Sequence, residues 1–285
     1  MIAESRATFA GVETRVLSVP GSGTPVVLLH GYADSADTWR PVLTRLECLG
    51  HKAVAVDLPG FGRAALRAPG PLLPQFDAFA DALLQELGPV VLVGNSLGAA
   101  TAVRAAAHNS DLVNALVALD DPLNARHWIA RLARRRAVPE IVWAWVARMP
   151  VPAGALRWVT VRAVPKVLYG PGVTADPEVV AYWSTVVSGS PGIAELGRDA
   201  FRYAHEALGT HRDVQVSCPT VVVHGRRDFI IPARASRVLH QQITGSELVI
   251  LPRSGHCPQL DNPDAVTRII AELLGRAHGR TESAG

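Results

Sequence analysis

The sequence predicts an α/β fold, in which a mostly parallel sheet is flanked by helices and a helical segment is inserted into the chain. Short runs rich in valine and leucine alternate with segments of helical periodicity, and this alternation is typical of a parallel sheet. One such run, residues 90–93, continues through a glycine-flanked serine into a helix-compatible segment. From about residue 121 to about residue 215 the alternation stops and helical patterns remain, which indicates the insertion.

The remaining elements follow from short apolar runs, which predict strands, and from apolar residues at helical spacing, which predict helices. We expect a hairpin over residues 8–19 that turns at Gly11, strands over 26–29, 53–56, 90–93, 115–119, 219–225 and 247–251, and helices over 36–49, 74–87, 232–243 and 262–274. The core then comprises residues 1–120 and 216–275, and the polar tail, 276–285, is expected to be disordered.

The inserted segment, residues 121–215, is expected to form a helical cap. Prolines should break it into short helices, namely Pro139, Pro150, Pro152, Pro165, Pro171, Pro177 and Pro191. Between Asp121 and Gly170 it has nine basic residues (Arg126, Arg131, Arg134, Arg135, Arg136, Arg148, Arg157, Arg162, Lys166) against Asp121 and Glu140, and four of the six tryptophans. We favour an amphipathic cap with solvated arginines, and the alternative is a cap that contacts an anionic membrane surface or substrate.

A strand followed by Gly94-Asn95-Ser96-Leu97-Gly98 and then by a helix predicts an exposed nucleophile. The sharp turn holds the serine in a strained conformation, and side chains two residues to either side would collide there. Glycine at both positions removes the collision. The Ser96 hydroxyl then lies at a helix N-terminus, where free N–H groups favour the negative charge that acyl transfer develops.

This segment resembles the nucleophile elbow of the α/β-hydrolase fold family, and the resemblance extends over most of the chain. It implies an eight-stranded sheet, a helical cap, and a triad in the chain order Ser, Asp, His. Ser96 matches the nucleophile, Asp228 the acid of the G-x-x-D pattern, and His256 the base in a G-H loop before a proline. Asp120 and Asp121 stay open as alternative acids, because some relatives place the acid after the preceding core strand.

The resemblance also implies an oxyanion hole formed by the backbone N–H groups of Tyr32 and Leu97, each such donor being worth about 3 kcal/mol. Asn95 and the ring of Tyr32 are expected to contact the substrate. His30, before Gly31, and Asp57, in a D-L-P-G-F-G turn, are expected to be structural.

These residues predict a serine hydrolase, first of all a carboxylesterase that cleaves a small-to-medium apolar acyl ester without a metal or cofactor. A carbon–carbon bond hydrolase, a thioesterase and a cofactor-free perhydrolase of the same fold are alternatives. Asn95 is reminiscent of the carbon–carbon hydrolases, whereas Tyr32-Ala33-Asp34 and Cys257 depart from their pattern. A ligand-binding receptor without catalysis is the alternative from another class.

Composition excludes several other roles. The net charge of +3 is small for 285 residues, and no basic run coincides with a nucleic-acid motif, so no nucleic-acid partner is expected. Cys48, Cys218 and Cys257 lack disulfide or metal spacing. Since no signal peptide or membrane-spanning run is found, we expect a cytoplasmic protein. The oligomeric state stays open.

Overall fold

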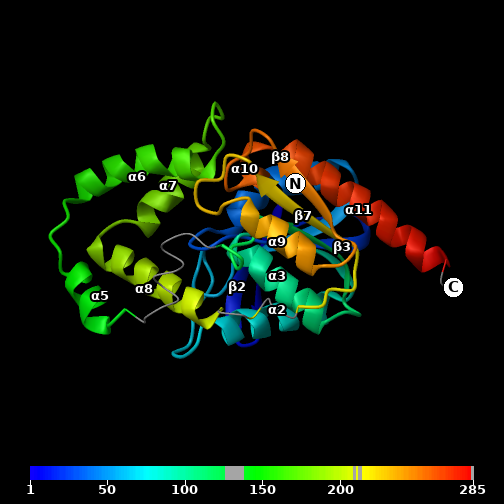
Figure 1. Ribbon diagram of the computed structural model, residues 1–285, viewed down its shortest axis with the longest axis horizontal. Coiled ribbons are helices and arrows are strands. Elements are labelled where there is room, and N and C mark those ends of the chain that lie inside the picture. The colour runs from blue at the N-terminus through cyan, green and yellow to red at the C-terminus, as the bar shows by residue number, and fades with distance from the viewer. Residues whose placement is uncertain (126–137, 208–209, 211–213, 284–285) are drawn as a thin grey trace.

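An eight-stranded, mostly parallel sheet forms the core of the molecule (Figure 1). The computed structural model describes residues 1–125, 138–207, 210 and 214–283. The strands lie in the order β1-β2-β4-β3-β5-β6-β7-β8, and β2 runs antiparallel to both of its neighbours. The predicted fold class is thereby confirmed. The strands are β1 (Ala3–Phe9), β2 (Val12–Val19), β3 (Ser22–Leu29), β4 (His51–Val56), β5 (Val90–Asn95), β6 (Val113–Leu119), β7 (Thr220–Gly225) and β8 (Glu247–Leu251).

The carboxyl ends of the parallel strands meet at one edge of the sheet. In the ladder, Leu29 of β3 pairs with Gly94 of β5, and Asn95 pairs with Leu119 of β6. At the far side Gly225 of β7 pairs with Leu251 of β8. Loops that are distant in sequence therefore open at the same edge, which is where ligands bind in sheets of this kind.

Helices cover both faces of the sheet because each central strand is apolar on both sides. On one face α2 (Leu73–Leu87), α3 (Leu97–His108) and α9 (Arg234–Gln242) pack against one set of strand residues, including Val27 and Leu29. On the other face η1 (Ala36–Trp39), α1 (Arg40–Cys48) and α11 (Pro263–Ser283) pack against the alternate set, including Val26 and Leu28. A short helix, α10 (Pro258–Asp261), precedes α11.

Helix α11 differs from its prediction. We expected it to end at Leu274, before Gly275, and to be followed by a disordered tail over residues 276–285. The helix instead continues to Ser283, and residues 284 and 285 lie outside the described residues. A glycine costs a helix only about 1 kcal/mol relative to alanine, and the neighbouring leucines, alanines and arginines favour helix.

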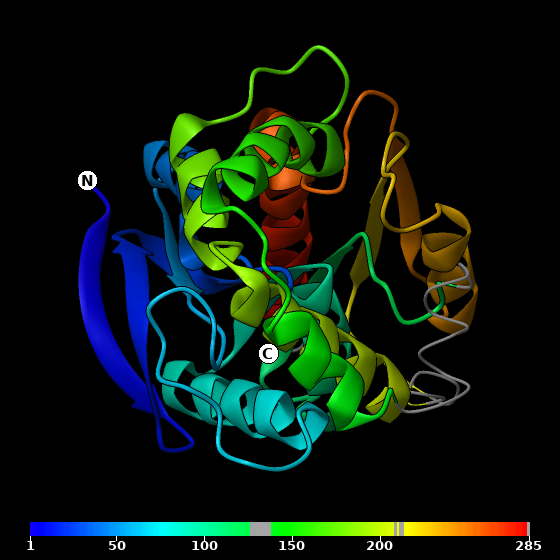
Figure 2. The same cartoon turned by 90° about the vertical axis from the view of Figure 1, so that its left-hand side faces the viewer.

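Four described helices follow β6 and precede β7 in the chain, and they lie together at one end of the molecule (Figures 1 and 2). They are α5 (Glu140–Ala147), α6 (Ala153–Leu168), α7 (Pro177–Val186) and α8 (Ser190–Glu206). They occupy the segment expected to form the cap. Arg126, Arg131, Arg134, Arg135 and Arg136 of the basic set, together with Trp128, lie outside the described residues.

Four of the seven prolines expected to break this segment lie at helix starts, where the missing N–H costs no helical hydrogen bond, and one of them is Pro191, the second residue of α8. Pro139 and Pro152 are N-cap residues of α5 and α6, and Pro177 is the first residue of α7. Pro165 is different, because it lies inside α6 rather than breaking it. None of the helices in the described ranges combines the length and apolar character needed to cross a bilayer.

Candidate active site

Ser96 forms a strained turn between β5 and α3. Its backbone has φ 53° and ψ −115°, a conformation that a non-glycine residue rarely adopts. A Cβ at Gly94 would collide with the carbonyl group of Gly98, and one at Gly98 would collide with the carbonyl oxygen of Leu29. The two glycines therefore permit the turn, which leaves the serine 7% exposed.

His256 and Asp228 are hydrogen-bonded to each other. The imidazole Nδ1 lies 2.7 Å from Asp228 Oδ2, although the residues come from the separate loops after β8 and β7. The other carboxylate oxygen of Asp228 accepts from the N–H groups of Ile230 (2.7 Å) and Ile231 (2.9 Å). With Nδ1–H donating to Asp228, the lone pair of Nε2 is available as a base.

The pKa of Asp228 lies below its usual range. Burial alone would raise it, but the charge and hydrogen bond of His256 and the two backbone donors outweigh burial. The carboxylate is therefore ionised at neutral pH and can stabilise an imidazolium.

Asn95 links the serine turn to the histidine loop. Its Nδ2 donates to the carbonyl oxygen of His256 over 2.9 Å, and its Oδ1 accepts from Gln259 over 3.2 Å. We expected Asn95 to contact the substrate, but its side chain is 1% exposed and its amide makes these internal bonds instead. Within the described residues, no hydrogen bond joins the Ser96 hydroxyl to His256, and such bonds often tighten only when substrate binds.

The loop after β3 passes directly beside Ser96. A Cβ built on Gly31 would lie 3.4 Å from the Cβ of Ser96. Among the residues that the structure describes, no group accepts from the N–H of Tyr32 or from that of Leu97, the first residue of α3. Two free donors near the serine are what an oxyanion requires.

The side chain of Tyr32 contacts helix α8 and the ring of Phe61. Its hydroxyl donates to the carbonyl oxygen of Leu196 in α8 over 2.6 Å, and the ring contacts Phe61 edge-on at 5.1 Å. A second tyrosine, Tyr182 of α7, donates to the carbonyl oxygen of Asp34 over 3.0 Å. Helices α7 and α8 are thus joined to the loop that carries the candidate oxyanion donor.

Asp120 and Asp121 are both buried, and neither is hydrogen-bonded to His256 among the described contacts. Asp120 Oδ1 accepts from the N–H of Gly225 over 3.0 Å, while Asp121 Oδ1 accepts from the N–H of Leu123 over 2.9 Å. Burial and the neighbouring charge of Asp228 raise the pKa of Asp120 well above its usual range. The protonated form of Asp120 is therefore favoured relative to that of an ordinary aspartate.

Asp120, His224 and Asp228 place three metal-ligating atoms within 4.8 Å of one another. The group does not suit a metal ion, because its atoms already bind protein. Nδ1 of His224 lies 2.8 Å from the hydroxyl of Ser236, and Nε2 lies 3.2 Å from the carbonyl oxygen of Ile231. Both carboxylate oxygens of Asp228 are engaged, one by His256 and the other by two backbone N–H groups.

The residues that hold the histidine loop were not identified from the sequence. Asp261 Oδ2 accepts from the N–H of Gly255 (2.6 Å) and from that of Gly170 (2.8 Å), just after α6. The N–H of Cys257 donates to the carbonyl oxygen of Leu168 over 2.9 Å. The histidine loop is therefore hydrogen-bonded to the end of α6. In the sequence, Asp261 is recognisable as the acidic residue that follows the G-H-x-P pattern of residues 255–258.

Asp34 is a second residue that sequence reasoning missed. It lies at the end of the loop that contains Tyr32, and burial raises the pKa of its carboxyl to about 7 even though hydrogen bonds to Ser35 and Thr38 and the charge of His256 lower it. A titrating carboxyl close to a candidate base can influence the pH profile of the site.

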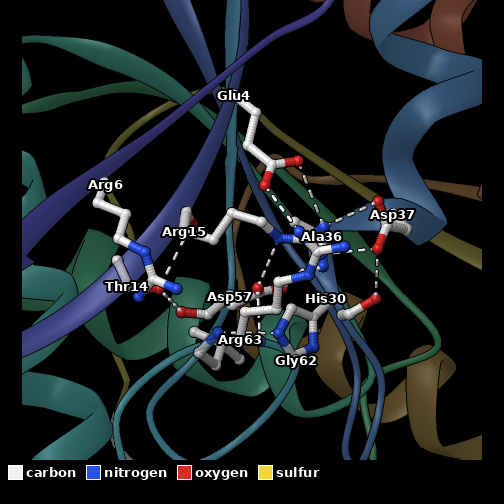
Figure 3. A network of polar contacts seen from close by, with 12 residues as sticks. Glu4, Arg6, Thr14, Arg15, His30, Ala36, Asp37, Asp57, Gly62 and Arg63 are labelled. Atoms are coloured by element: carbon white, nitrogen blue, oxygen red, sulfur yellow. Dashed lines mark hydrogen bonds and ion pairs between the residues drawn. The ribbon is translucent and has the colours of Figure 1, made fainter. Parts of the chain in front are cut away.

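An ion-pair network around the buried Arg15 joins β2, η1 and the loop after β4 (Figure 3). Arg15 donates from Nε to Asp57 over 2.9 Å and from Nη2 to Asp37 over 2.7 Å. Asp57 also accepts from the N–H of Ala36 over 2.6 Å, and His30 Nε2 accepts from the N–H of Leu58 over 2.8 Å. Asp57 and His30 thus have the structural roles expected of them.

A family model described as the alpha/beta hydrolase family matches residues 26–269. The chain belongs to the alpha/beta hydrolase family. Together with the esterases to which the chain is similar, this membership shows that the protein is an enzyme, a hydrolase.

Named members of the family align over nearly the whole chain. Esterase Rv0045c of Mycobacterium tuberculosis is 31% identical over 259 residues, which cover 89% of this chain and 84% of that protein. A 2-hydroxy-6-oxo-6-(2'-aminophenyl)hexa-2,4-dienoic acid hydrolase of Metapseudomonas resinovorans is 27% identical over 298 residues, covering 96% and 91%. The solved structure of a malate-bound thermophilic esterase from Thermogutta terrifontis aligns with a TM-score of 0.72 at 25% identity, covering 97% and 99%.

Proposed function

We propose that this hydrolase is a carboxylesterase that cleaves small-to-medium apolar acyl esters, with Ser96 as nucleophile, His256 as base and Asp228 as acid. The observation that carries the proposal is the 2.7 Å hydrogen bond between His256 and Asp228 at the sheet edge where the strained Ser96 turn lies. The similarity to an esterase at 31% identity supports the ester class.

Acylation begins when Nε2 of His256 takes the proton from the Ser96 hydroxyl as its oxygen attacks the ester carbonyl carbon. The carbonyl oxygen becomes an oxyanion, and the N–H groups of Tyr32 and Leu97 are the donors proposed to hold it. Asp228 stabilises the imidazolium. When the carbon–oxygen bond to the alcohol breaks, His256 returns the proton to the leaving oxygen.

Deacylation repeats these steps with water. His256 takes a proton from a water molecule that attacks the acyl carbon, and it then protonates Ser96 as the acid leaves. Asn95 acts indirectly, because its amide fixes the carbonyl oxygen of His256 and thereby the position of the base. The proposed cycle requires no metal or organic cofactor.

The cap residues near the site support an apolar acyl group. Val164, Leu168 and Val179 of the cap form a buried cluster with Cys257, next to His256, and Trp183 packs against it. Trp183 also packs against the main core cluster, together with Val186 and Leu196. Apolar side chains thus face the core from the cap, and they would exclude water from an acyl chain.

The experiment is a pre-steady-state assay with p-nitrophenyl esters of increasing acyl length. We expect a burst of p-nitrophenol equal to the enzyme concentration, followed by slower turnover. Ser96→Ala should abolish the burst, whereas Ser110→Ala, at an exposed serine, should not change it. A burst that survives in Ser96→Ala would overturn the proposed nucleophile, and no burst with any ester would favour the ligand-binding alternative.

Carbon–carbon bond hydrolysis is the second candidate, and the similarity to the dienoic acid hydrolase of Metapseudomonas resinovorans favours it. Asn95, the residue that resembles this class of hydrolase, is buried and bonded to the histidine loop, which weakens that connection. Assaying loss of the chromophore of a 2-hydroxy-6-oxo-dienoate beside the ester series decides between the two. Turnover of the dienoate that exceeds turnover of the best ester in kcat/KM would favour the second candidate.

A further inference from the structure

The outer edge of the cap exposes many apolar side chains. We call residues 139–168, which comprise α5, the link after it and α6, the cap edge. It lies at the end of the molecule opposite the C-terminus and faces the viewer in Figure 2. None of the α5 side chains is buried. The exposed large apolar residues of the cap edge are Ile141, Val142, Trp145, Met149, Val151, Trp158, Val159, Val161 and Val167.

Helix α5 has a packed face and a free face. Trp143 packs against Phe201 of α8, with ring centroids 5.6 Å apart. On the free face, Ile141, Trp145 and Arg148 follow one another at helical spacing, and Ile141 and Trp145 are 75% and 66% exposed. Trp143 thus packs α5 against α8, whereas Ile141 and Trp145 lie exposed on the other side of the helix.

Helix α6 repeats this arrangement. Val164 and Leu168 are buried, whereas Trp158, Arg162 and Lys166 follow one another at four-residue spacing on the exposed side. The guanidinium of Arg162 stacks over the Trp158 ring at 4.2 Å, and Trp158 is 59% exposed. Beside this face, α6 and α7 form a groove of about 720 Å³ lined mostly by apolar residues, with Arg157 at its edge.

The cap edge is also basic. Its charged residues are Arg148, Arg157, Arg162 and Lys166 against Glu140. Arg148 and Arg162 donate to carbonyl oxygens of their own helices, those of Ala144 and Trp158, rather than to a carboxylate among the described residues. These positive charges are therefore free to attract an anionic surface.

We propose that the cap edge binds the surface of an anionic phospholipid bilayer, with Trp145 and Trp158 in the headgroup region and the basic residues near lipid phosphates. Tryptophan and arginine on exposed helix faces are the combination that such interfaces select. Charge argues against a second copy of this chain as the occupant, since two net-basic faces repel each other. The two helices, Glu140–Ala147 and Ala153–Leu168, suit a position on the surface.

The test is co-sedimentation of the full-length enzyme with vesicles of phosphatidylcholine alone and of phosphatidylcholine mixed with phosphatidylglycerol. We expect binding only to the anionic vesicles and its loss at high salt. Arg162→Gln with Lys166→Gln should weaken binding about 30-fold, as removal of two surface charges at about 1 kcal/mol each predicts. Trp145→Ala with Trp158→Ala should weaken it by about tenfold or more.

Matched controls lie on the core, where Leu49 and Arg268 are exposed. Leu49→Ala and Arg268→Gln should bind vesicles as the wild type does, and every variant should keep its far-UV circular dichroism. Equal binding to both vesicle types, or binding that both cap-edge pairs leave unchanged, overturns the proposal. A second result would also overturn the proposal: the wild type binds no vesicles but self-associates in sedimentation velocity, and Trp145→Ala with Trp158→Ala abolishes this self-association. Vesicle binding needs no turnover, so Ser96→Ala should bind equally, and the result is independent of the proposed esterase activity.

Discussion

The carboxyl groups of Asp120 and Asp228 place oxygens within 4.8 Å of each other, and both side chains are buried. Two buried carboxylates so close cannot both ionise easily. Asp228 is the ionised member because it binds His256 and two backbone N–H groups, and the pKa of Asp120 is raised instead. The pair therefore combines Asp228, which favours ionisation and binds His256, with Asp120, which favours its protonated form.

Asp228→Asn and Asp120→Asn should differ greatly from each other in kcat. Asp228→Asn should lower kcat about 10⁴-fold, because asparagine favours the wrong imidazole tautomer. Asp120→Asn replaces a carboxyl group that favours its protonated form by a neutral amide of the same shape, and it should change kcat by less than about threefold. Steady-state kinetics on a p-nitrophenyl ester measures both. An Asp120→Asn enzyme as inactive as Asp228→Asn would make Asp120 the acid.

The glycine at position 98 should be indispensable to the turn. Gly98→Ala places a Cβ against the carbonyl oxygens of Leu29 and His30, and we expect it to lower the free energy of unfolding by about 3 kcal/mol or more, or to prevent folding. Gly154→Ala is the matched control, because nothing lies within 4 Å of the added Cβ in α6. Urea denaturation should show it as stable as the wild type or slightly more stable, and equal losses in both variants would contradict this explanation.

Asp34 should make stability depend on pH. Burial raises its pKa to about 7, so the folded state resists ionisation that the unfolded chain undergoes near pH 4. The free-energy cost of ionising Asp34 in the folded protein is absent in strong acid and grows as the pH rises. It reaches its full size above the pKa of the folded state. Between about pH 5 and about pH 8 this group should lower the free energy of unfolding by about 2–3 kcal/mol.

Asp34→Asn should remove that part of the pH dependence, as urea denaturation across the pH range can measure. Asp111→Asn, at an exposed site, is the control and should leave the profile unchanged. A wild-type profile that Asp34→Asn leaves equally steep would show that Asp34 ionises normally.

Tyr32→Phe separates the backbone of this residue from its side chain. The substitution removes the hydrogen bond to Leu196 but keeps the N–H group, so kcat should fall by less than about threefold. Amide exchange in α8 should become faster, since a link between cap and core is lost. A large fall in kcat with unchanged exchange would mean that the hydroxyl acts in the chemistry.

Sequence periodicity predicted the strand order along the chain and the glycine-flanked turn, because both depend on local spacing. Periodicity did not predict features that depend on contacts between distant parts of the chain. Asn95 was expected to contact substrate and instead binds the histidine loop, and Asp261 gains its role only because α6 ends beside Gly255. Pro165 was expected to break a helix that continues through it.

The proposed mechanism depends most on Ser96 as the residue that carries the acyl group. Intact-protein mass spectrometry after rapid acid quench of the enzyme with a p-nitrophenyl ester measures this directly. We predict one acyl adduct, located on the Ser96 peptide by fragmentation, and its absence in Ser96→Ala and His256→Ala. An adduct on another residue, or turnover of the ester without any adduct, would contradict the proposed mechanism.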